Sequence, residues 1–168
     1  FVAARLGFRQ AGKPFADRRE GAGVGGGVRA RRAADRRLVD IDDLVEEFQP
    51  LDAVVVGGTT GESPALERPE LEELIRRARK RLAGRIPLIA GSGTAGTAKS
   101  IALSKAAEAA GADALLVVTP YYNRPTQEGL VQHFTAIADA VSIPLILYNV
   151  PGRTACDLLP ATIATLSR

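Results

Sequence analysis

The chain has 168 residues, of which 46% are hydrophobic and 24% charged, a composition typical of one globular domain. It contains no apolar run near the ~20 residues of a membrane span, so we expect no membrane partner. Nine Arg and one Lys against three acids give residues 1–37 a charge of about +7, while the whole chain carries +3. The remainder is therefore acidic, which is not typical of a nucleic-acid-binding domain.

Residues 1–35 form an irregular basic segment. Seven glycines up to Gly27 and a run of arginines leave no period of 2 or 3.6. One interpretation is an arm that binds nucleic acid or acidic surfaces. The other is a segment without an evolved fold or stable packing, which the lack of interleaved aromatic residues favours. We therefore expect no nucleic-acid partner, and we take residues 36–168 as the domain.

Four apolar, β-branched runs predict strands: Ala53–Gly57, Ile86–Ala90, Ala114–Val118 and Ile143–Tyr148. Five segments predict helices: Leu38–Phe48, Glu67–Leu82, Thr97–Ala110, Gln127–Ala140 and Asp157–Leu166, the last with Asp157 as its N-cap. The spacing of about 30 residues is that of a βα unit. Strict alternation implies an α/β fold with a parallel sheet, which a doubly wound sheet and a β/α barrel would both satisfy.

Helical periodicity also predicts which side chains are buried. One stripe faces the core from the second helix: Leu71, Leu74, Ile75, Ala78 and Leu82. On its wet face, Glu72–Arg76 and Glu73–Arg77 are spaced as i,i+4 pairs. Leu130, Phe134 and Ile137 are expected to point inward from the fourth helix.

The first strand ends in a loop of small and hydroxylated residues, Gly57–Ser63. Glycines allow a ligand to approach the main chain, and Thr59 and Thr60 add hydroxyl groups. Such a loop at the end of a buried strand favours a site for a small carboxylate or phosphate.

Two later strands also end in unusual loops. Pro120–Pro125 contains adjacent tyrosines, Tyr121 and Tyr122, which predict a polar site or a subunit contact. Tyr148–Thr154 begins with a tyrosine at the carboxyl end of a strand, and its Arg153 is able to bind a carboxylate through two hydrogen bonds.

Other motifs favour ordinary structural roles. Gly91–Gly96 matches GxGxxG between a strand and a helix, but the next strand lacks the acid that would bind a ribose, so we do not expect NAD. The only cysteine, Cys156, excludes an internal disulfide and favours a reducing cytoplasm. It is expected to pack rather than react, because the only histidine, His133, lies in a predicted helix. We expect neither a metal ion nor a cofactor.

Three motifs together resemble one family. They are Gly58–Ser63 with Glu70 downstream, Tyr121–Pro125 and Asn149–Thr154. From about residue 51 onward the chain is similar to the dihydrodipicolinate synthase family, one of the pyruvate-dependent aldolases that include N-acetylneuraminate lyase. The resemblance implies a (β/α)8 TIM barrel, of which the chain would hold about strands 2–5, with the site at the carboxyl ends of the strands.

The resemblance also implies a chemistry. A lysine forms a Schiff base with pyruvate, and the enamine attacks aspartate semialdehyde. Thr60 and its neighbouring backbone at Gly58 would bind the pyruvate carboxylate. Tyr148 would transfer protons, and Thr59 would complete a hydroxyl relay with Tyr122, which reaches in from a neighbouring subunit. Arg153 would receive the carboxylate of the semialdehyde and separate this chain from its sialic-acid relatives.

The resemblance has two departures. The family's Schiff-base lysine follows the last predicted helix, so we expect it to be absent from this chain, whose lysines are Lys13, Lys80, Lys99 and Lys105. The barrel-opening strand is also missing. We therefore expect a fragment that is inactive alone and a homo-oligomer, a tetramer in the family, when the barrel is complete. The alternatives are a related aldolase acting on another aldehyde and a truncated, non-enzymatic product.

Overall fold

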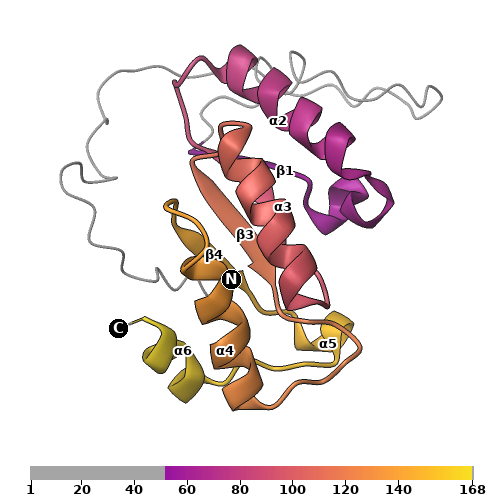
Figure 1. The fold of residues 1–168 in the computed structure, drawn as a ribbon, viewed down its shortest axis with the longest axis vertical. Helices are drawn as coiled ribbons and strands as arrows, with labels where there is room; N and C mark the ends of the chain where they lie inside the picture. Colours follow the sequence, from indigo (N-terminus) through magenta and orange to yellow (C-terminus); the bar gives the residue numbers. More distant parts are fainter. Residues whose placement is uncertain (1–51, 168) are drawn as a thin grey trace, which may run out of the picture.

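A four-stranded parallel sheet lies at the centre of the molecule, with its strands side by side in chain order (Figure 1). The computed structural model describes residues 52–167. The strands are β1 Val54–Val56, β2 Leu88–Gly91, β3 Ala114–Val118 and β4 Leu145–Tyr148. The prediction of an α/β fold with a parallel sheet is confirmed.

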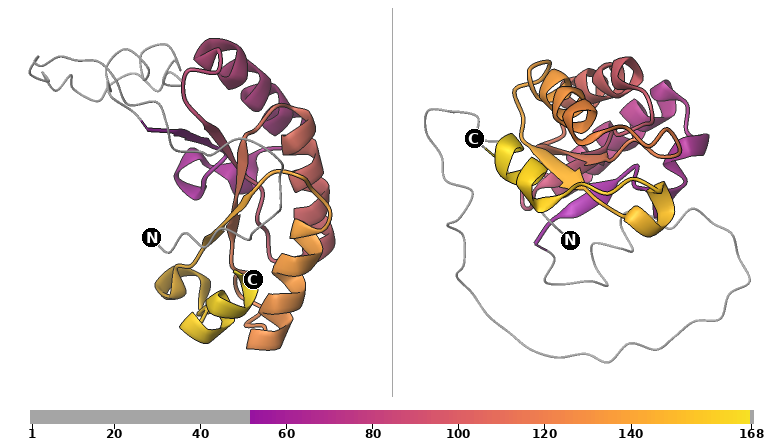
Figure 2. Two further views of the ribbon diagram at one scale, coloured as in Figure 1. Left: turned by 90° about the vertical axis from the view of Figure 1, so that its left-hand side faces the viewer. Right: turned by 90° about the horizontal axis from the view of Figure 1, so that it is seen from below.

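Three long helices connect the strands and cover one face of the sheet (Figure 2). They are α2 Arg68–Leu82, α3 Thr97–Ala109 and α4 Gln127–Ala138. Shorter elements follow the first and fourth strands: η1 Thr59–Gly61, η2 Ser63–Ala65, α5 Pro151–Thr154 and α6 Pro160–Leu166. The alternation of strands and long helices agrees with the prediction, whereas η1, η2 and α5 have no counterpart among the predicted elements.

Strand register divides the sheet into two different faces. One row of Cα partners is buried beneath the helices: Val56, Ala90, Leu115 and Leu145. A neighbouring row on the opposite face is only partly buried: Gly91, Leu116 and Ile146. On that same face Val55 is 49% exposed. The described part of the chain therefore covers one side of its sheet with helices and leaves apolar side chains on the other.

The predicted helical stripes supply the core. Leu71, Ile75, Ala78 and Leu82 are buried on α2, and Leu74 packs partly buried against them. The three residues expected to face inward from α4 are fully buried: Leu130, Phe134 and Ile137. Burial of each large apolar side chain contributes about 1.5–3 kcal/mol, so this layer stabilises the arrangement of strand ends on which the site is built.

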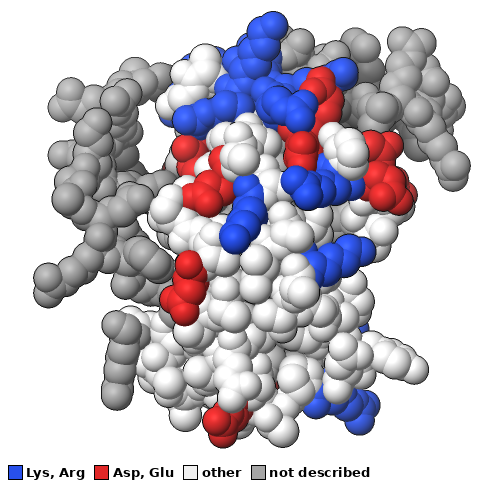
Figure 3. Space-filling model, in the orientation of Figure 1, with Lys and Arg blue, Asp and Glu red and all other residues white. Residues whose placement is uncertain are grey.

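Charged side chains gather over α2, whereas the surface over α4 and α6 in the same view is mostly uncharged (Figure 3). The two predicted pairs form there, Arg76 to Glu72 at 3.3 Å and Arg77 to Glu73 at 2.8 Å. Exposed pairs of this kind contribute only about 0–1 kcal/mol each. These pairs belong to the solvent-exposed face of α2 and do not define a binding site.

Prolines shorten two of the predicted strands. β2 begins at Leu88 rather than Ile86, and β4 begins at Leu145 rather than Ile143. Pro87 and Pro144 each accept a hydrogen bond from the neighbouring strand through the carbonyl, but they have no N–H to continue the ladder.

The predicted start of the last helix was wrong. α6 begins at Pro160 with Leu159 as its N-cap, so Asp157 caps no helix. Asp157 instead accepts a hydrogen bond at Oδ1 from Nδ2 of Asn149, at 2.8 Å. The predicted helix Leu38–Phe48 and the basic segment 1–35 lie outside the described residues.

Candidate active site

The loop after β1 is a pair of short 3-10 turns at the carboxyl end of the strand. Gly57 begins it with a φ of 63°, and a Cβ atom there would lie 2.7 Å from Cδ1 of Leu71. The Gly61 amide then donates to the Gly58 carbonyl at 2.9 Å. This turn places the hydroxyl residues Thr59 and Thr60 at the strand end, where the sequence predicted an anion site.

Close backbone approach explains two of the three glycines of the GxGxxG pattern, Gly91 and Gly93. A Cβ atom on Gly91 would lie 2.0 Å from the carbonyl oxygen of Gly57. A Cβ atom on Gly93 would lie 2.3 Å from the amide nitrogen of Val118. These two glycines let the ends of β1, β2 and β3 pack against one another, a structural role that requires no dinucleotide.

A cavity of about 410 Å³ opens at the carboxyl ends of the strands. Three of the predicted site residues line it, Thr59, Tyr148 and Arg153. Tyr148 ends β4, and its register partner is Val118 at the end of β3, which also lines the cavity. Arg153 enters from α5, the turn that follows β4. The cavity thus brings together side chains that follow or end β1 and β4, the two outer strands of the described sheet.

The other three predicted site residues do not line this cavity. Gly58 and Thr60 belong to the same loop as Thr59, but Thr60 is exposed and lies outside the wall. Tyr122 is 89% exposed, whereas its neighbour Tyr121 lines the cavity.

The loop that carries Tyr122 is held in an unusual conformation. Tyr122 has a φ of 72° and Arg124 a φ of 47°. Both values lie in the left-handed region, where a residue other than glycine has a conformational cost of about 1–3 kcal/mol. Hydrogen bonds compensate for this strain. The Tyr122 amide donates to the Thr154 carbonyl at 3.1 Å, and Asn123 Nδ2 donates to the Ala95 carbonyl at 3.2 Å. These hydrogen bonds hold the loop in the conformation that leaves Tyr122 exposed.

Thr154 is a central residue that the sequence patterns did not single out. Its side chain is buried, and its Oγ1 lies 3.0 Å from the Val150 carbonyl and accepts from the Cys156 amide at 3.3 Å. Thr119 at the end of β3 donates to the same atom at 3.4 Å. Thr154 thus holds the turn of Arg153 against the neighbouring strand. Its place as a hydroxyl residue in the Asn149–Thr154 motif after a strand was the only sequence feature that could have indicated this role.

A further set of side-chain hydrogen bonds fixes the segment between β4 and α6. Asn149, next to Tyr148, accepts from the Leu158 amide at Oδ1, at 3.1 Å, and donates to Asp157. Gln127 at the start of α4 donates to the Asp157 carbonyl at 2.8 Å. These contacts determine where the chain leaves the site.

Neither the cysteine nor the histidine belongs to the cavity wall. Cys156 is buried in the core, and burial and the Asp157 charge raise the pKa of its thiol. His133 is buried in α4, with Nδ1 at 2.9 Å from Oγ1 of Thr97, and burial lowers the pKa of its ring. Cys156 thus packs in the core as predicted, and His133 lies in a helix as predicted. No group of three or more His, Cys, Asp and Glu within residues 52–167 is arranged to hold a metal ion.

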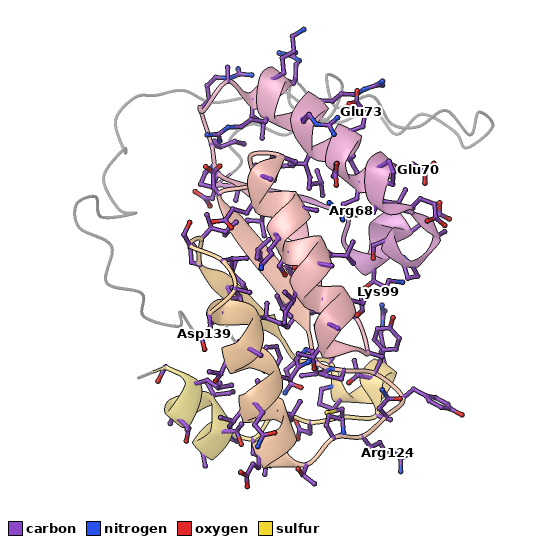
Figure 4. The ribbon with its side chains drawn as sticks, in the orientation of Figure 1. Arg68, Glu70, Glu73, Lys99, Arg124 and Asp139 are labelled. Atoms are coloured by element: carbon purple, nitrogen blue, oxygen red, sulfur yellow. The ribbon has the colours of Figure 1, made fainter. Side chains whose placement is uncertain are left out.

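The three described lysines lie on helices, as predicted. Lys80 and Lys105 are exposed on α2 and α3, outside the cavity wall. Lys99, in the first turn of α3, lines the cavity, which the sequence patterns did not predict (Figure 4).

None of the helices described here is long and apolar enough to cross a membrane.

Comparison with known proteins identifies relatives along most of the chain. Residues 32–168 match the model of the Dihydrodipicolinate synthetase family. The chain is similar to the 4-hydroxy-tetrahydrodipicolinate synthase of Methylococcus capsulatus, with 56% identity over 133 residues, 79% of this chain and 44% of that protein. For the enzyme of the same name from Pseudomonas savastanoi pv. phaseolicola the identity is 62% over 115 residues, 68% of this chain and 39% of that protein. The chain therefore spans less than half the length of these relatives.

Solved structures agree with these matches. A chloride-inhibited dihydrodipicolinate synthase from Acinetobacter baumannii, solved in complex with pyruvate, is 50% identical with a TM-score of 0.71. The match covers 75% of this chain and 43% of that one. The predicted TIM-barrel class is confirmed by neighbours of this kind, and the described residues form part of such a barrel.

Proposed function

The chain belongs to the dihydrodipicolinate synthetase family, and we propose that its protein condenses pyruvate with aspartate semialdehyde to form 4-hydroxy-tetrahydrodipicolinate. This is a step of lysine and diaminopimelate biosynthesis. The observation that carries the proposal is the cavity at the strand ends, where Thr59, Tyr148 and Arg153 meet. The identity of 56–62% to synthases of that name supports it.

The first half of the proposed reaction uses pyruvate. A lysine amine attacks the ketone carbon, water leaves, and the Schiff base loses a methyl proton to become an enamine. We assign the pyruvate carboxylate to Thr60 and the backbone at Gly58, which belong to the same loop as Thr59 but do not themselves line the cavity. Tyr148 transfers the protons, because a phenol with hydroxyl partners is able to donate and accept at neutral pH. Thr59 supplies one of those partners from the same cavity wall.

The second half joins the enamine to the aldehyde carbon of the semialdehyde, whose oxygen takes a proton. The amino group of the semialdehyde then attacks the imine carbon, closes the ring and displaces the lysine amine. Arg153 receives the semialdehyde carboxylate, a role that its guanidinium suits because it forms two parallel hydrogen bonds with a carboxylate. Its place in the wall beside Tyr148 and Val150 supports this assignment. Arg153 also favours this substrate over the aldehydes of related pyruvate aldolases.

Tyr122 acts in the proposal from a second copy of the chain. Its ring is 89% exposed and outside its own cavity, on a loop fixed by hydrogen bonds. A residue presented in this way is suited to complete the hydroxyl relay of a neighbouring subunit. The proposal therefore includes a homo-oligomer. It also includes a cytoplasmic location, because a single free cysteine, Cys156, suits a reducing compartment.

The Schiff-base lysine of the proposal is not one of the lysines described here. Lys80 and Lys105 are exposed on helices, and Lys99 is an exposed residue of α3 rather than part of a strand. A nucleophilic amine needs a lowered pKa and a fixed place beside the carbonyl. We therefore propose that this chain alone does not turn over.

Borohydride reduction in the presence of pyruvate tests the proposal, with adducts located by mass spectrometry. The 168-residue chain should give no stoichiometric adduct, whereas the chain extended to a full barrel with the corresponding segments of a relative should give one at a new lysine. An adduct on Lys80, Lys99 or Lys105 would contradict the assignment. Failure of the extended protein to form any adduct, although folded and pyruvate-bound, would refute the Schiff-base reaction itself.

A further inference from the structure

We propose that Asn149 is a positioning residue for Arg153, and that its side-chain amide determines where the chain presents this guanidinium to the second substrate. The proposed reaction gives Asn149 no role of its own. The inference rests on the proposed function for the role of Arg153, whereas the contacts of Asn149 stand on the structure alone.

Asn149 lies beside the cavity but outside its wall. Its neighbours in the chain, Tyr148 and Val150, both line the cavity, whereas Asn149 does not. Its side-chain amide is instead bonded to the protein. Oδ1 accepts from the Leu158 amide at 3.1 Å, and Nδ2 donates to the Leu158 carbonyl at 3.4 Å and to Oδ1 of Asp157 at 2.8 Å. Both donor hydrogens of this amide are thus in use, so Asn149 holds the chain rather than a ligand.

These hydrogen bonds close the loop that carries Arg153. Residues 149 and 158 are the two ends of the loop, and the single turn of α5 lies between them. The amides of Arg153 and Thr154 both donate to the Val150 carbonyl, at 2.9 and 3.0 Å, so the turn is held together by its own bonds. Thr154 fixes the middle of the loop against β3, and Asn149 fixes its ends. The place of Arg153 in the cavity wall therefore depends on both residues.

The far end of the loop is anchored to the molecule independently of Asn149. Leu158 is 2% exposed and belongs to the core. Gln127 at the start of α4 donates to the Asp157 carbonyl at 2.8 Å and accepts from the Leu159 amide at 3.2 Å. The helix that follows, α6, packs beside α4 (Figure 1). Since Asn149 directly follows β4, its amide ties the end of that strand to a fixed point.

The chemistry of these contacts requires an amide. The backbone of Leu158 needs an acceptor and a donor at once, and Asn149 supplies both. A carboxylate at position 149 would keep the acceptor, lose the donor and lie beside the like charge of Asp157. Exchange of the two side chains, in the double variant Asn149→Asp and Asp157→Asn, would again pair a donor with an acceptor.

Amide exchange of the 168-residue chain, followed by mass spectrometry, tests the contacts. Asn149→Ala should speed exchange roughly tenfold within residues 150–158 and leave the amides of β3 unchanged, because only the loop loses hydrogen bonds. Asn149→Asp should have the same effect, and the double variant with Asp157→Asn should recover part of the protection. Gln132→Ala, at an exposed amide of α4, is the control and should change neither region. Unchanged exchange in the loop, equally faster exchange throughout the chain, or no recovery in the double variant would overturn the proposal.

Kinetics of the protein extended to a full barrel test the link to Arg153. Asn149→Ala should lower kcat/KM for aspartate semialdehyde roughly tenfold and leave borohydride trapping of pyruvate unchanged. In an Arg153→Ala background the same change should cost less than about twofold, because no guanidinium remains to be positioned. Equal losses with and without Arg153, or a parallel loss of trapping, would refute the positioning role. If the extended protein without substitutions formed no adduct, the proposed function would fail, and the exchange measurement would still decide whether Asn149 holds the loop.

Discussion

Oγ1 of Thr119 and Oγ1 of Thr154 lie 3.4 Å apart, and this contact joins the end of β3 to the turn that carries Arg153. Both residues are buried, at 0% and 4% exposure. A buried hydroxyl pair is stable only while its partners are present. The geometry of the cavity edge at Arg153 therefore depends on Thr154.

We predict that Thr154→Val destabilises the chain by about 1–3 kcal/mol, because the Thr119 hydroxyl and the Cys156 amide lose their acceptor in a buried place. Thr154→Ser keeps the hydroxyl and should lose less. Urea unfolding followed by circular dichroism measures both. Thr165→Val, at an exposed threonine on α6 that donates to the Ala161 carbonyl, is the matched control and should change stability by less than about 0.5 kcal/mol. A Thr154→Val protein as stable as this control would contradict the role of the pair.

A second prediction concerns the glycines between the strand ends. Gly91→Ala should cost about 3 kcal/mol or more, or prevent folding, because the added Cβ would lie 2.0 Å from the backbone oxygen of Gly57. Gly96, in the same GxGxxG pattern, has no atom within 4 Å of its would-be Cβ. Gly96→Ala should therefore change the free energy of unfolding by no more than about 1 kcal/mol. Similar costs for the two variants would show that the pattern serves another purpose.

Sequence periodicity predicted the βα units well because burial controls them locally. The stripe of Leu71, Ile75 and Ala78 on α2 and the run Ala114–Val118 of β3 are both visible in the order of apolar residues and are found where expected. Boundaries were less predictable where a hydrogen bond replaces a periodic contact. Asp157 looked like a helix cap, but tertiary contacts with Asn149 give it a different partner.

The site could be predicted only in part from the sequence. The loops at the strand ends pointed to Tyr148 and Arg153, which line one cavity. Lys99 and Thr154 were missed for different reasons. The side chain of Lys99 lines the cavity from a helix, so no strand-end motif contains it. The contact of Thr154 that joins two strand ends is made with Thr119, a residue 35 positions away, and no local pattern encodes such a pairing.

The third prediction follows from the lowered pKa of His133. Burial favours the neutral ring, so the pKa lies below its ordinary value of 6.5 in the folded state. The unfolded chain then binds more protons than the folded chain at pH values just below 6.5, and stability must fall as the pH falls through that range. Urea unfolding at pH 7.5, 6.5 and 5.5 should show this loss. His133→Gln should reduce the loss between pH 6.5 and 5.5, because no other histidine is present. An unchanged pH dependence in the variant would mean that other groups cause it.

The final prediction concerns Arg153 in the extended, Schiff-base-forming protein. Arg153→Ala removes a charged group that we expect to contact the semialdehyde and not pyruvate. It should lower kcat/KM for aspartate semialdehyde roughly 10- to 100-fold, the value of one charge-assisted hydrogen-bonded contact. Borohydride trapping of pyruvate should be unchanged. Arg77→Ala, at an exposed arginine of α2 whose one ion pair among residues 52–167 is with Glu73, is the control and should leave both quantities as they are. Equal losses in trapping and in semialdehyde turnover would mean that Arg153 positions the catalytic groups, and unchanged kinetics would remove it from the site.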